Sequence, residues 1–254
     1  MKKNLKKYIF THLKKLGLKK NDKLLVYSDL SRFGLNNKKL PSIVISSLKK
    51  IIGNKGTIIM PFYIFEDNKE FIFDKKKFIF TNKIGSLTKS FCKEKNLVRS
   101  NCLIHNHIGI GPQAKILNFS SENISIGKKS DFELMMKNNF KLLLLGCDPI
   151  QGATYLHHLE ALYEVPYRKW INVYKKKIEK RKINNVSIKY FAKKNNQYIS
   201  NFNPIFDRLN NDKKFLKVDK IKYGRSFSIK LKNLHNFGLS LLRKNKYSFV
   251  KKKQ

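Results

Sequence analysis

Hydrophobic and polar residues along the first 168 positions follow helical and strand periods in turn. The period of about 3.6 predicts helices at 3–17, 38–52, 85–95, 112–118, 129–138 and 153–165. Short apolar runs predict strands at 23–28, 57–60 and 141–146, with a hairpin or extended excursion at 62–80 and an irregular stretch at 98–112. Strands that alternate with helices are typical of an α/β fold, so we expect a mainly parallel central sheet flanked by helices.

The pattern changes after residue 168. Alternation of apolar and charged residues predicts an antiparallel hairpin from 169–178 and 183–192, and the remainder predicts a helix at 203–210, a strand at 215–223 and a helix at 228–244. The lysines at 251–253 are expected to form a frayed tail. Because no Gly/Ser/Pro-rich linker precedes residue 169, we expect a single structural domain. Residues 1–168 form its α/β catalytic core in this interpretation, and 169–254 form a basic β-hairpin/helix extension packed on it.

Composition narrows the class of protein. The 254 residues, 41% of them hydrophobic, suffice for a substantial core, and no uncharged apolar run reaches the roughly 18 residues of a membrane span. Lys14 and Lys15 interrupt the apolar residues of the basic N-terminus, which favours an amphipathic helix over a signal peptide. Three cysteines in no metal-binding pattern favour the reducing cytoplasm and argue against a structural zinc site.

The net charge of +38 suggests an anionic ligand or surface. However, only seven of the 55 basic residues are arginine, the residue favoured for bidentate phosphate recognition, and no nucleic-acid-binding motif is present. Abundant Lys, Asn, Ile and Phe together indicate an AT-rich coding sequence as the main cause of the charge. Residues 169–254 still carry 25 lysines and arginines against four acidic residues, so binding of nucleic acid or an anionic surface through this third is the alternative.

Candidate chemistry gathers in the segment KLLLLGCDPIQGATYLHHLEALYEVPYR, residues 141–168. A strand-like run leads through a turn to a helix that carries His157 and Glu160. Residues three apart share one helix face, so the carboxylate can orient the imidazole and make it a better general base. The alternative is that both belong to the solvent face of an amphipathic helix. A nucleophilic role for Cys147 is the less favoured option because apolar surroundings keep a thiol inert.

Four segments, taken in order, resemble the aminoglycoside 3-N-acetyltransferase family. They are LLVYSDLSRFG (24–34), GTIIMPFY (56–63), VRSNCLIHNHIGIGPQA (98–114) and the segment at 141–168. The last is similar to the family's Leu-Leu-Leu-Gly…Thr-x-Leu-His-x-x-Glu…Tyr-Arg pattern. The resemblance implies a cytoplasmic acetyltransferase that passes acetyl directly from acetyl-CoA to a primary amine of an aminoglycoside or amino sugar, without a metal.

The resemblance also implies roles for individual residues. His157 would be the general base and Glu160 its partner, and a hydroxyl or backbone N–H near Ser28 or Ser100 would stabilise the oxyanion. The residues implied to contact acetyl-CoA are Tyr27, Ser28, Asp29, Leu30, Ser31, Gly34, Arg99 and Ser100. Those implied to contact the acceptor are Asn106, Thr154 and Glu164. A structural role is the alternative for Arg99, and it is the favoured one for His105 and His107.

The chain departs from the family pattern at four places. Tyr27 stands where many members have His, Asp29 where they have Ser, Cys102-Leu103 replace His-Pro, and Asn106 replaces Ser. An inactive member of the family is therefore a further alternative. The positive charge favours an anionic amino sugar, as in surface-polysaccharide biosynthesis, over a polycationic antibiotic and a resistance role, unless Glu160, Glu164 and Asp148 form an acidic pocket. The sequence leaves open whether the chain forms a homodimer.

Overall fold

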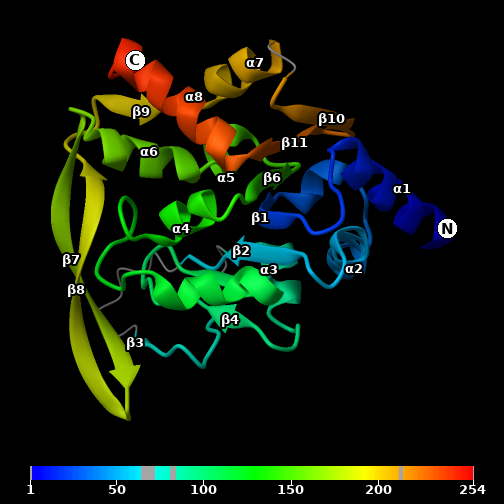
Figure 1. Cartoon of the computed structure of the whole chain (residues 1–254), viewed down its shortest axis with the longest axis horizontal. Helices are drawn as coiled ribbons and strands as arrows, with labels where there is room; N and C mark the ends of the chain where they lie inside the picture. The colour runs from blue at the N-terminus through cyan, green and yellow to red at the C-terminus, as the bar shows by residue number, and fades with distance from the viewer. Residues whose placement is uncertain (1, 64–71, 81–83, 212–213, 254) are drawn as a thin grey trace.

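A seven-stranded mixed sheet forms the centre of the computed structural model, which describes residues 2–63, 72–80, 84–211 and 214–253 (Figure 1). The strand order is β10-β11-β6-β1-β2-β5-β4. Its strands are β1 (Lys23–Ser28), β2 (Thr57–Pro61), β4 (Val98–Arg99), β5 (His107–Ile110), β6 (Lys141–Leu145), β10 (Lys217–Ile221) and β11 (Gly224–Lys230).

The three central strands are parallel, and every other pairing in this sheet is antiparallel. β1 pairs with β6 on one side, where Leu25 lies opposite Leu142, and with β2 on the other, where Leu25 lies opposite Ile59. These strands are continuous apolar runs because helices cover both of their faces. The predicted α/β architecture, with a parallel core and helices on both sides, is confirmed.

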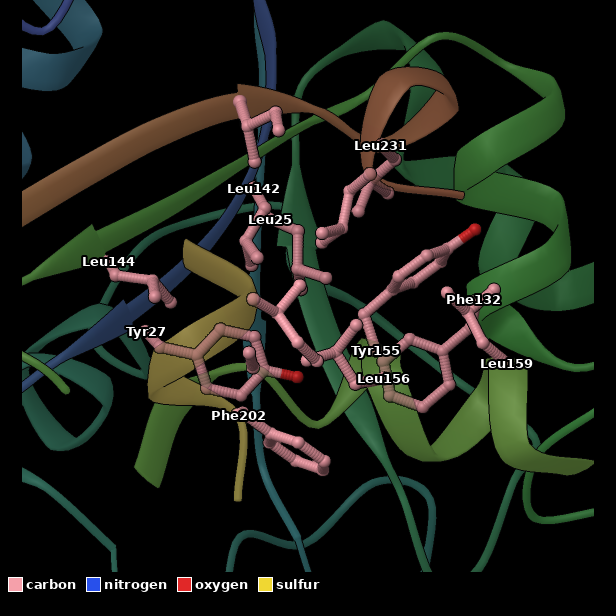
Figure 2. Close-up of a cluster of buried hydrophobic side chains, with 14 of the residues drawn as sticks. Leu25, Tyr27, Phe132, Leu142, Leu144, Tyr155, Leu156, Leu159, Phe202 and Leu231 are labelled. Atoms are coloured by element: carbon pink, nitrogen blue, oxygen red, sulfur yellow. The ribbon is translucent and has the colours of Figure 1, made fainter. Parts of the chain in front are cut away.

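Alternate residues of β1 enter two separate hydrophobic layers, because successive strand side chains point to opposite faces. Leu24 and Val26 pack in the layer under α1, α2 and α3, whereas Leu25 and Tyr27 pack in the layer under α4, α6 and α8. Figure 2 shows this second layer, where Tyr27 and Leu25 lie among side chains of α4, α6 and α8. The helices are α1 (Lys2–Lys15), α2 (Leu40–Ile52), α3 (Ser86–Phe91), α4 (Asp131–Lys137), α5 (Pro149–Gly152), α6 (Tyr155–Tyr163), α7 (Asn203–Asn211) and α8 (Leu231–Lys244), with 3₁₀ helices η1 (Leu30–Phe33) and η2 (Pro112–Phe119).

The C-terminal third contributes to the central sheet as well as to an arm. β7 (Arg168–Glu179) and β8 (Lys182–Lys193) form the predicted hairpin, a long twisted ribbon along the side opposite α1 (Figure 1). The turn at Lys180 and Arg181 adopts positive φ at both positions, as a two-residue hairpin requires. β11 pairs with β6, so residues beyond the ribbon return to the middle of the molecule.

Several sequence expectations are corrected by the pairings. The stretch 98–112, expected to be irregular, contains β4 and β5, which are too short to show a strand period. β11 occupies residues 224–230, of which 228–230 were expected in the last helix; that helix begins at Leu231. The expected frayed tail forms β12 (Val250–Lys252), antiparallel to β9 (Tyr198–Ser200).

The segment expected at 62–80 is described only in part. Its residues 64–71 lie outside the described residues. In the remainder, β3 (Ile72–Phe73) pairs in parallel with β7 at Lys176 and Lys177, rather than forming a hairpin with a neighbour in sequence. This contact ties the segment to the β7–β8 ribbon.

Candidate active site

The helix α6 brings His157 and Glu160 into direct contact. The His157 Nδ1 lies 2.5 Å from the Glu160 Oε2, as the spacing of three residues predicts. The His157 side chain is 26% exposed, whereas the Glu160 side chain is fully buried. Arg168 Nη2 also lies 3.1 Å from this Nδ1. An ionised carboxylate can only accept, so the short contact assigns the hydrogen to Nδ1 and the lone pair to Nε2, the nitrogen a general base uses.

Tyr167 and Arg168, which follow α6, hold the Glu160 carboxylate. The Arg168 Nε lies 2.8 Å from Oε2, and the Tyr167 hydroxyl donates to Oε1 at 2.9 Å. Burial raises the pKa of Glu160, but the nearby His157, Arg168 and Tyr167 outweigh it and hold that pKa below its ordinary value. Glu160 is therefore ionised at neutral pH, and its assignment to the solvent face of an amphipathic helix is wrong.

Tyr167 and Arg168 were not singled out from the sequence. Arg168 begins β7, and its guanidinium also donates to the Phe191 carbonyl at 3.2 Å, so the ribbon fixes its position. The available signal was the Tyr-Arg pair that closes the family-like segment. Spacings of seven and eight residues from Glu160 would share its face only on a continuous helix, and α6 ends at Tyr163, so helix periodicity does not predict these contacts.

A pocket of about 380 Å³ opens where β1 and β2 end. Tyr27, Ser28 and Asp29, all expected to contact the co-substrate, are among its lining residues. Pro61, Tyr63, Ile84, Gly85, Thr88, Cys147 and Gln151 complete the lining. The carboxyl ends of parallel strands are the usual ligand site of open α/β sheets.

Thr154 connects this pocket with the helix that carries His157. Its hydroxyl is hydrogen-bonded to the hydroxyls of Tyr27 and Tyr63. The His157 backbone N–H donates to the Thr154 carbonyl at 3.0 Å, one helical turn away. The structure therefore links two sequence-expected residues, Tyr27 and Thr154, to the turn that carries His157.

Five expected co-substrate residues lie outside the pocket lining, and three of them belong to the turn after β1. Leu30 is buried in the core, and the Ser31 hydroxyl donates to Asp29, which caps η1. Gly34 ends η1 with φ of +65°, and a Cβ there would lie 2.4 Å from the Lys222 side chain. These three residues build the turn that presents Ser28 and Asp29.

Arg99 is enclosed by protein groups. Its guanidinium donates to the carbonyls of Asp74 and Lys77 and to Asn106 Oδ1, and it lies 4.4 Å from the centre of the Phe73 ring. Burial lowers the pKa of Arg99 to about 10. Arg99 therefore braces the segment around β3, as in the structural alternative for this residue.

Ser100 and Asn106 are also structural. The fully buried Asn106 donates to the carbonyls of Ser100 and Cys102, while the Ser100 hydroxyl accepts from the Cys102 N–H and contacts Ser120. Their polar groups are engaged inside the loop between β4 and β5. The structure places Asn106, expected to contact the acceptor, and Ser100, expected near the oxyanion, outside the pocket lining.

The three carboxylates of the suggested acidic pocket have different surroundings. Glu160 is neutralised by Arg168, and Asp148 is paired with Arg32 at 2.7 Å. Glu164 is exposed at the end of α6, where it adopts φ of +53°. Two of the three charges are thus already compensated within the protein.

Cys147 and His105 are not activated for chemistry. Burial raises the pKa of the Cys147 thiol to about 12, so its nucleophilic thiolate is scarce at neutral pH. Burial lowers the pKa of His105 to about 3, and its Nδ1 is hydrogen-bonded to the Ser125 hydroxyl. Both therefore behave as buried structural residues.

The described parts of the chain contain no cluster of three or more His, Cys, Asp or Glu side chains arranged to hold a metal ion. Among the helices of those same parts, none combines the length and apolar character that crossing a bilayer requires.

Known proteins share both the sequence and the fold of this chain. A family model described as aminoglycoside 3-N-acetyltransferase matches residues 25–243. The SPbeta prophage-derived aminoglycoside N(3')-acetyltransferase-like protein YokD of Bacillus subtilis (strain 168) is 29% identical over 188 residues, which cover 66% of this chain and 68% of YokD.

Solved structures support the same relationship at the level of the fold. The crystal structure of YokD from Bacillus subtilis superposes with a TM-score of 0.78 and 23% identity, covering 94% of this chain and 99% of that one. AAC-IIIb in its binary complex with CoASH gives a TM-score of 0.81 and 18% identity, covering 94% and 96%. Because the family model spans most of the sequence, this chain belongs to the aminoglycoside 3-N-acetyltransferase family and is an acyltransferase.

Proposed function

We propose that this enzyme transfers acetyl from acetyl-CoA directly to a primary amine of an amino sugar, with His157 as the general base. The observation that carries the proposal is the His157–Glu160–Arg168 arrangement, in which a buried, ionised carboxylate orients a partly exposed imidazole. The family membership supports the reaction class.

Each part of the arrangement has a task in this chemistry. An amine is mostly protonated at neutral pH and has no lone pair until it loses a proton. His157 Nε2 accepts a proton from the amine as the nitrogen attacks the thioester carbonyl, and Glu160 stabilises the resulting imidazolium. The carbon–sulfur bond then breaks, and the CoA thiolate leaves and takes up a proton. Tyr167 and Arg168 keep Glu160 in position throughout.

The pocket beside Tyr27 fits the acyl end of acetyl-CoA. Its volume of about 380 Å³ lies at the lower end of the roughly 300–1,000 Å³ of ligand sites, which suits the thioester arm rather than the whole molecule. Pro61 and Ile84 offer apolar contacts, and Ser28 and Tyr27 offer hydroxyl groups. In this proposal acetyl-CoA supplies the activated acyl group, and the pocket orients its carbonyl.

The net charge of the protein, as well as its family, bears on the class of acceptor. Related structures were determined with sisomicin and with apramycin, which are ligands of those proteins. A protein of net charge +38 repels polycationic molecules at long range and attracts anionic ones. Two of the three candidate acidic groups are already paired, as described above. We therefore favour an amino sugar that carries a phosphate or another anionic group, such as a nucleotide-linked sugar of surface-polysaccharide biosynthesis.

We also propose a location, a domain organisation and an assembly for this protein. Three unpaired cysteines support a cytoplasmic location. The pairing of β11 with β6 supports a single structural domain in which the C-terminal third completes the core. A homodimer is the assembly we propose to test by light scattering.

The deciding experiment compares the unmodified enzyme with His157→Ala. Calorimetry with acetyl-CoA and thiol release in the presence of an amino-sugar panel should show a loss of turnover of about 10²–10⁴-fold in the variant, with acetyl-CoA affinity retained. His235→Ala is the matched control, because this half-buried histidine of α8 bonds Tyr155 outside the pocket lining. Absence of acetyl-CoA binding at low salt would overturn the proposal and favour the alternative of a basic binding protein. Binding without turnover across the panel would favour an inactive family member.

A further inference from the structure

A second polar chain leads from the interior of the protein to the same pocket. It joins Tyr27 of β1, Tyr63 after β2, His107 of β5 and Asp131 of α4. The hydroxyls of Tyr27 and Tyr63 are hydrogen-bonded to each other, and the Tyr63 hydroxyl lies 3.5 Å from the His107 Nε2. The His107 Nδ1 lies 2.7 Å from the Asp131 Oδ2.

The inner end of this chain is almost completely buried. The His107 and Asp131 side chains are 0% and 2% exposed, and the Phe132 ring lies 5.0 Å from the imidazole. The second carboxylate oxygen, Oδ1 of Asp131, has no hydrogen-bond partner in the described structure. Burying such a pair in apolar surroundings carries a free-energy cost, and a simple core contact would be cheaper with apolar side chains.

The outer end of this polar chain of side chains reaches the pocket. Tyr27 and Tyr63 both line the pocket that we assign to the thioester. Thr154 is hydrogen-bonded to both hydroxyls and lies one helical turn before His157. A carbonyl in this pocket would therefore lie beside hydroxyl groups that Thr154 connects to the helical turn carrying His157.

The hydroxyls are suited to donate hydrogen bonds. Burial raises the pKa of both Tyr27 and Tyr63, so they keep their protons and cannot act as bases at neutral pH. In this arrangement the His107–Asp131 pair holds two hydrogens, one between Nδ1 and Oδ2 and one on Nε2 that the Tyr63 oxygen accepts. The single Tyr63 hydrogen then goes to the Tyr27 oxygen, which also accepts from Thr154 while its own hydrogen turns to a ligand. Hydrogen bonds arranged in such a chain polarise and strengthen one another.

We propose that the Tyr27 hydroxyl donates a hydrogen bond to the carbonyl oxygen of the acyl thioester, and that Tyr63, held by His107 and Asp131, positions it. The inference rests on the proposed function, because it assigns the group that stabilises the oxyanion of that reaction. Tyr27 forms no covalent bond and loses no proton; it binds the oxygen most strongly when negative charge builds there.

Tyr27→Phe tests the donor directly, since it removes only the hydroxyl. We expect kcat to fall about 10²-fold, while the KM for acetyl-CoA and its calorimetric affinity change less than about threefold. Tyr155→Phe is the matched control, because it removes a buried tyrosine hydroxyl bonded to a histidine, His235, outside the pocket lining. This control should keep kcat within about twofold of the unmodified enzyme.

Asp131→Asn tests the positioning part in a double-mutant cycle with Tyr27→Phe. We expect the single change to lower kcat about tenfold, and to add little once the Tyr27 hydroxyl is absent, because it acts through that hydroxyl. A merely structural role would lower kcat by the same factor in both backgrounds and would overturn the positioning role.

The two proposals fail in different ways. If Tyr27→Phe keeps its kcat while His157→Ala loses turnover, the donor role is overturned and the proposed function stands. If the unmodified enzyme transfers no acetyl group to any acceptor of the panel, both are overturned.

Discussion

Glu160 is a fully buried carboxylate with three polar partners. Removing a charge from water is costly, and the cost is offset here by His157, Arg168 and the Tyr167 hydroxyl acting on the same two oxygens. The network leaves the imidazole as its more exposed member. In the proposed function, His157 is a base whose orientation is set by α6 and whose partner Glu160 is held by Arg168 of β7.

Glu160→Gln should reduce both turnover and stability. We expect kcat to fall at least about tenfold, because the imidazolium loses its counter-charge, and the free energy of unfolding to fall by about 2–4 kcal/mol, because Arg168 is left buried and unpaired. Thiol release and urea unfolding measure the two effects. Retention of full stability would contradict the assignment of Glu160 to a buried ion pair.

The same variant has a defined pH dependence. The folded-state pKa of Glu160 lies below its ordinary value of 4.5, so its stabilising effect is present above that value and is lost as pH falls through the lower one. The difference in unfolding free energy between the unmodified enzyme and Glu160→Gln should therefore shrink on acidification. A difference that grows toward low pH would contradict this sign.

Among the elements, two turns meet at the carboxyl end of the sheet. Gly146 follows β6 with φ of +68°, and a Cβ there would lie 2.4 Å from the Asp29 backbone oxygen. The Asp29 N–H donates to the Leu145 carbonyl at 2.9 Å, so the turn after β1 is fastened directly to the turn after β6. Gly146 allows this approach, which places Ser28 and Asp29 at the edge of the pocket.

Gly146→Ala should therefore disturb both the fold and the site. We expect a loss of about 3 kcal/mol in unfolding free energy, from the positive φ and the backbone clash together, and weaker acetyl-CoA binding by calorimetry. Gly17→Ala is the control: its φ is +73°, but its nearest neighbour is the Lys217 side chain at 3.4 Å. It should cost only about 1 kcal/mol and leave acetyl-CoA binding unchanged. Equal effects of the two changes would show that the close approach is unimportant.

The whole molecule carries a net charge of +38, and this field acts on every charged substrate. Long-range attraction accelerates the approach of anions and is screened by salt within about 10 Å at about 0.1 M ionic strength. Acetyl-CoA is itself anionic and should benefit. For the acceptor, the effect depends on the sign of its charge: the field attracts an anionic amino sugar and repels a polycationic one.

Salt dependence should reveal the class of acceptor. For an anionic amino sugar we expect the KM to rise severalfold as the salt concentration increases from about 0.05 M to about 0.3 M, because screening removes the attraction. For a polycationic aminoglycoside the KM should instead fall, because screening removes repulsion. Steady-state kinetics with one acceptor of each kind measures this. A KM that falls with salt for the better acceptor would overturn our preference for an anionic sugar.

Much of the fold could be predicted from local periodicity. The apolar runs of β1, β2 and β6 and the spacing in α1, α2 and α8 are properties of short segments, and the structure confirms these elements with small shifts in their ends. The shortest strands could not be predicted in this way. β4, β5 and β12 are two to four residues long, and each exists because a partner strand supplies its hydrogen bonds.

The same distinction applies to the candidate site: contacts between neighbours in sequence could be predicted, and contacts between distant residues could not. His157 and Glu160 are three residues apart, so helix geometry alone determines that they meet. Tyr167 and Arg168 meet Glu160 only because β7 turns back past α6, and Tyr27, Tyr63, His107 and Asp131 meet only because separate strands and a helix converge. The sequence by itself determined the local elements and the contact between His157 and Glu160, because these depend on neighbours in the chain. The tertiary structure alone decided burial, the supporting partners and the pocket, because these depend on contacts between residues far apart in sequence.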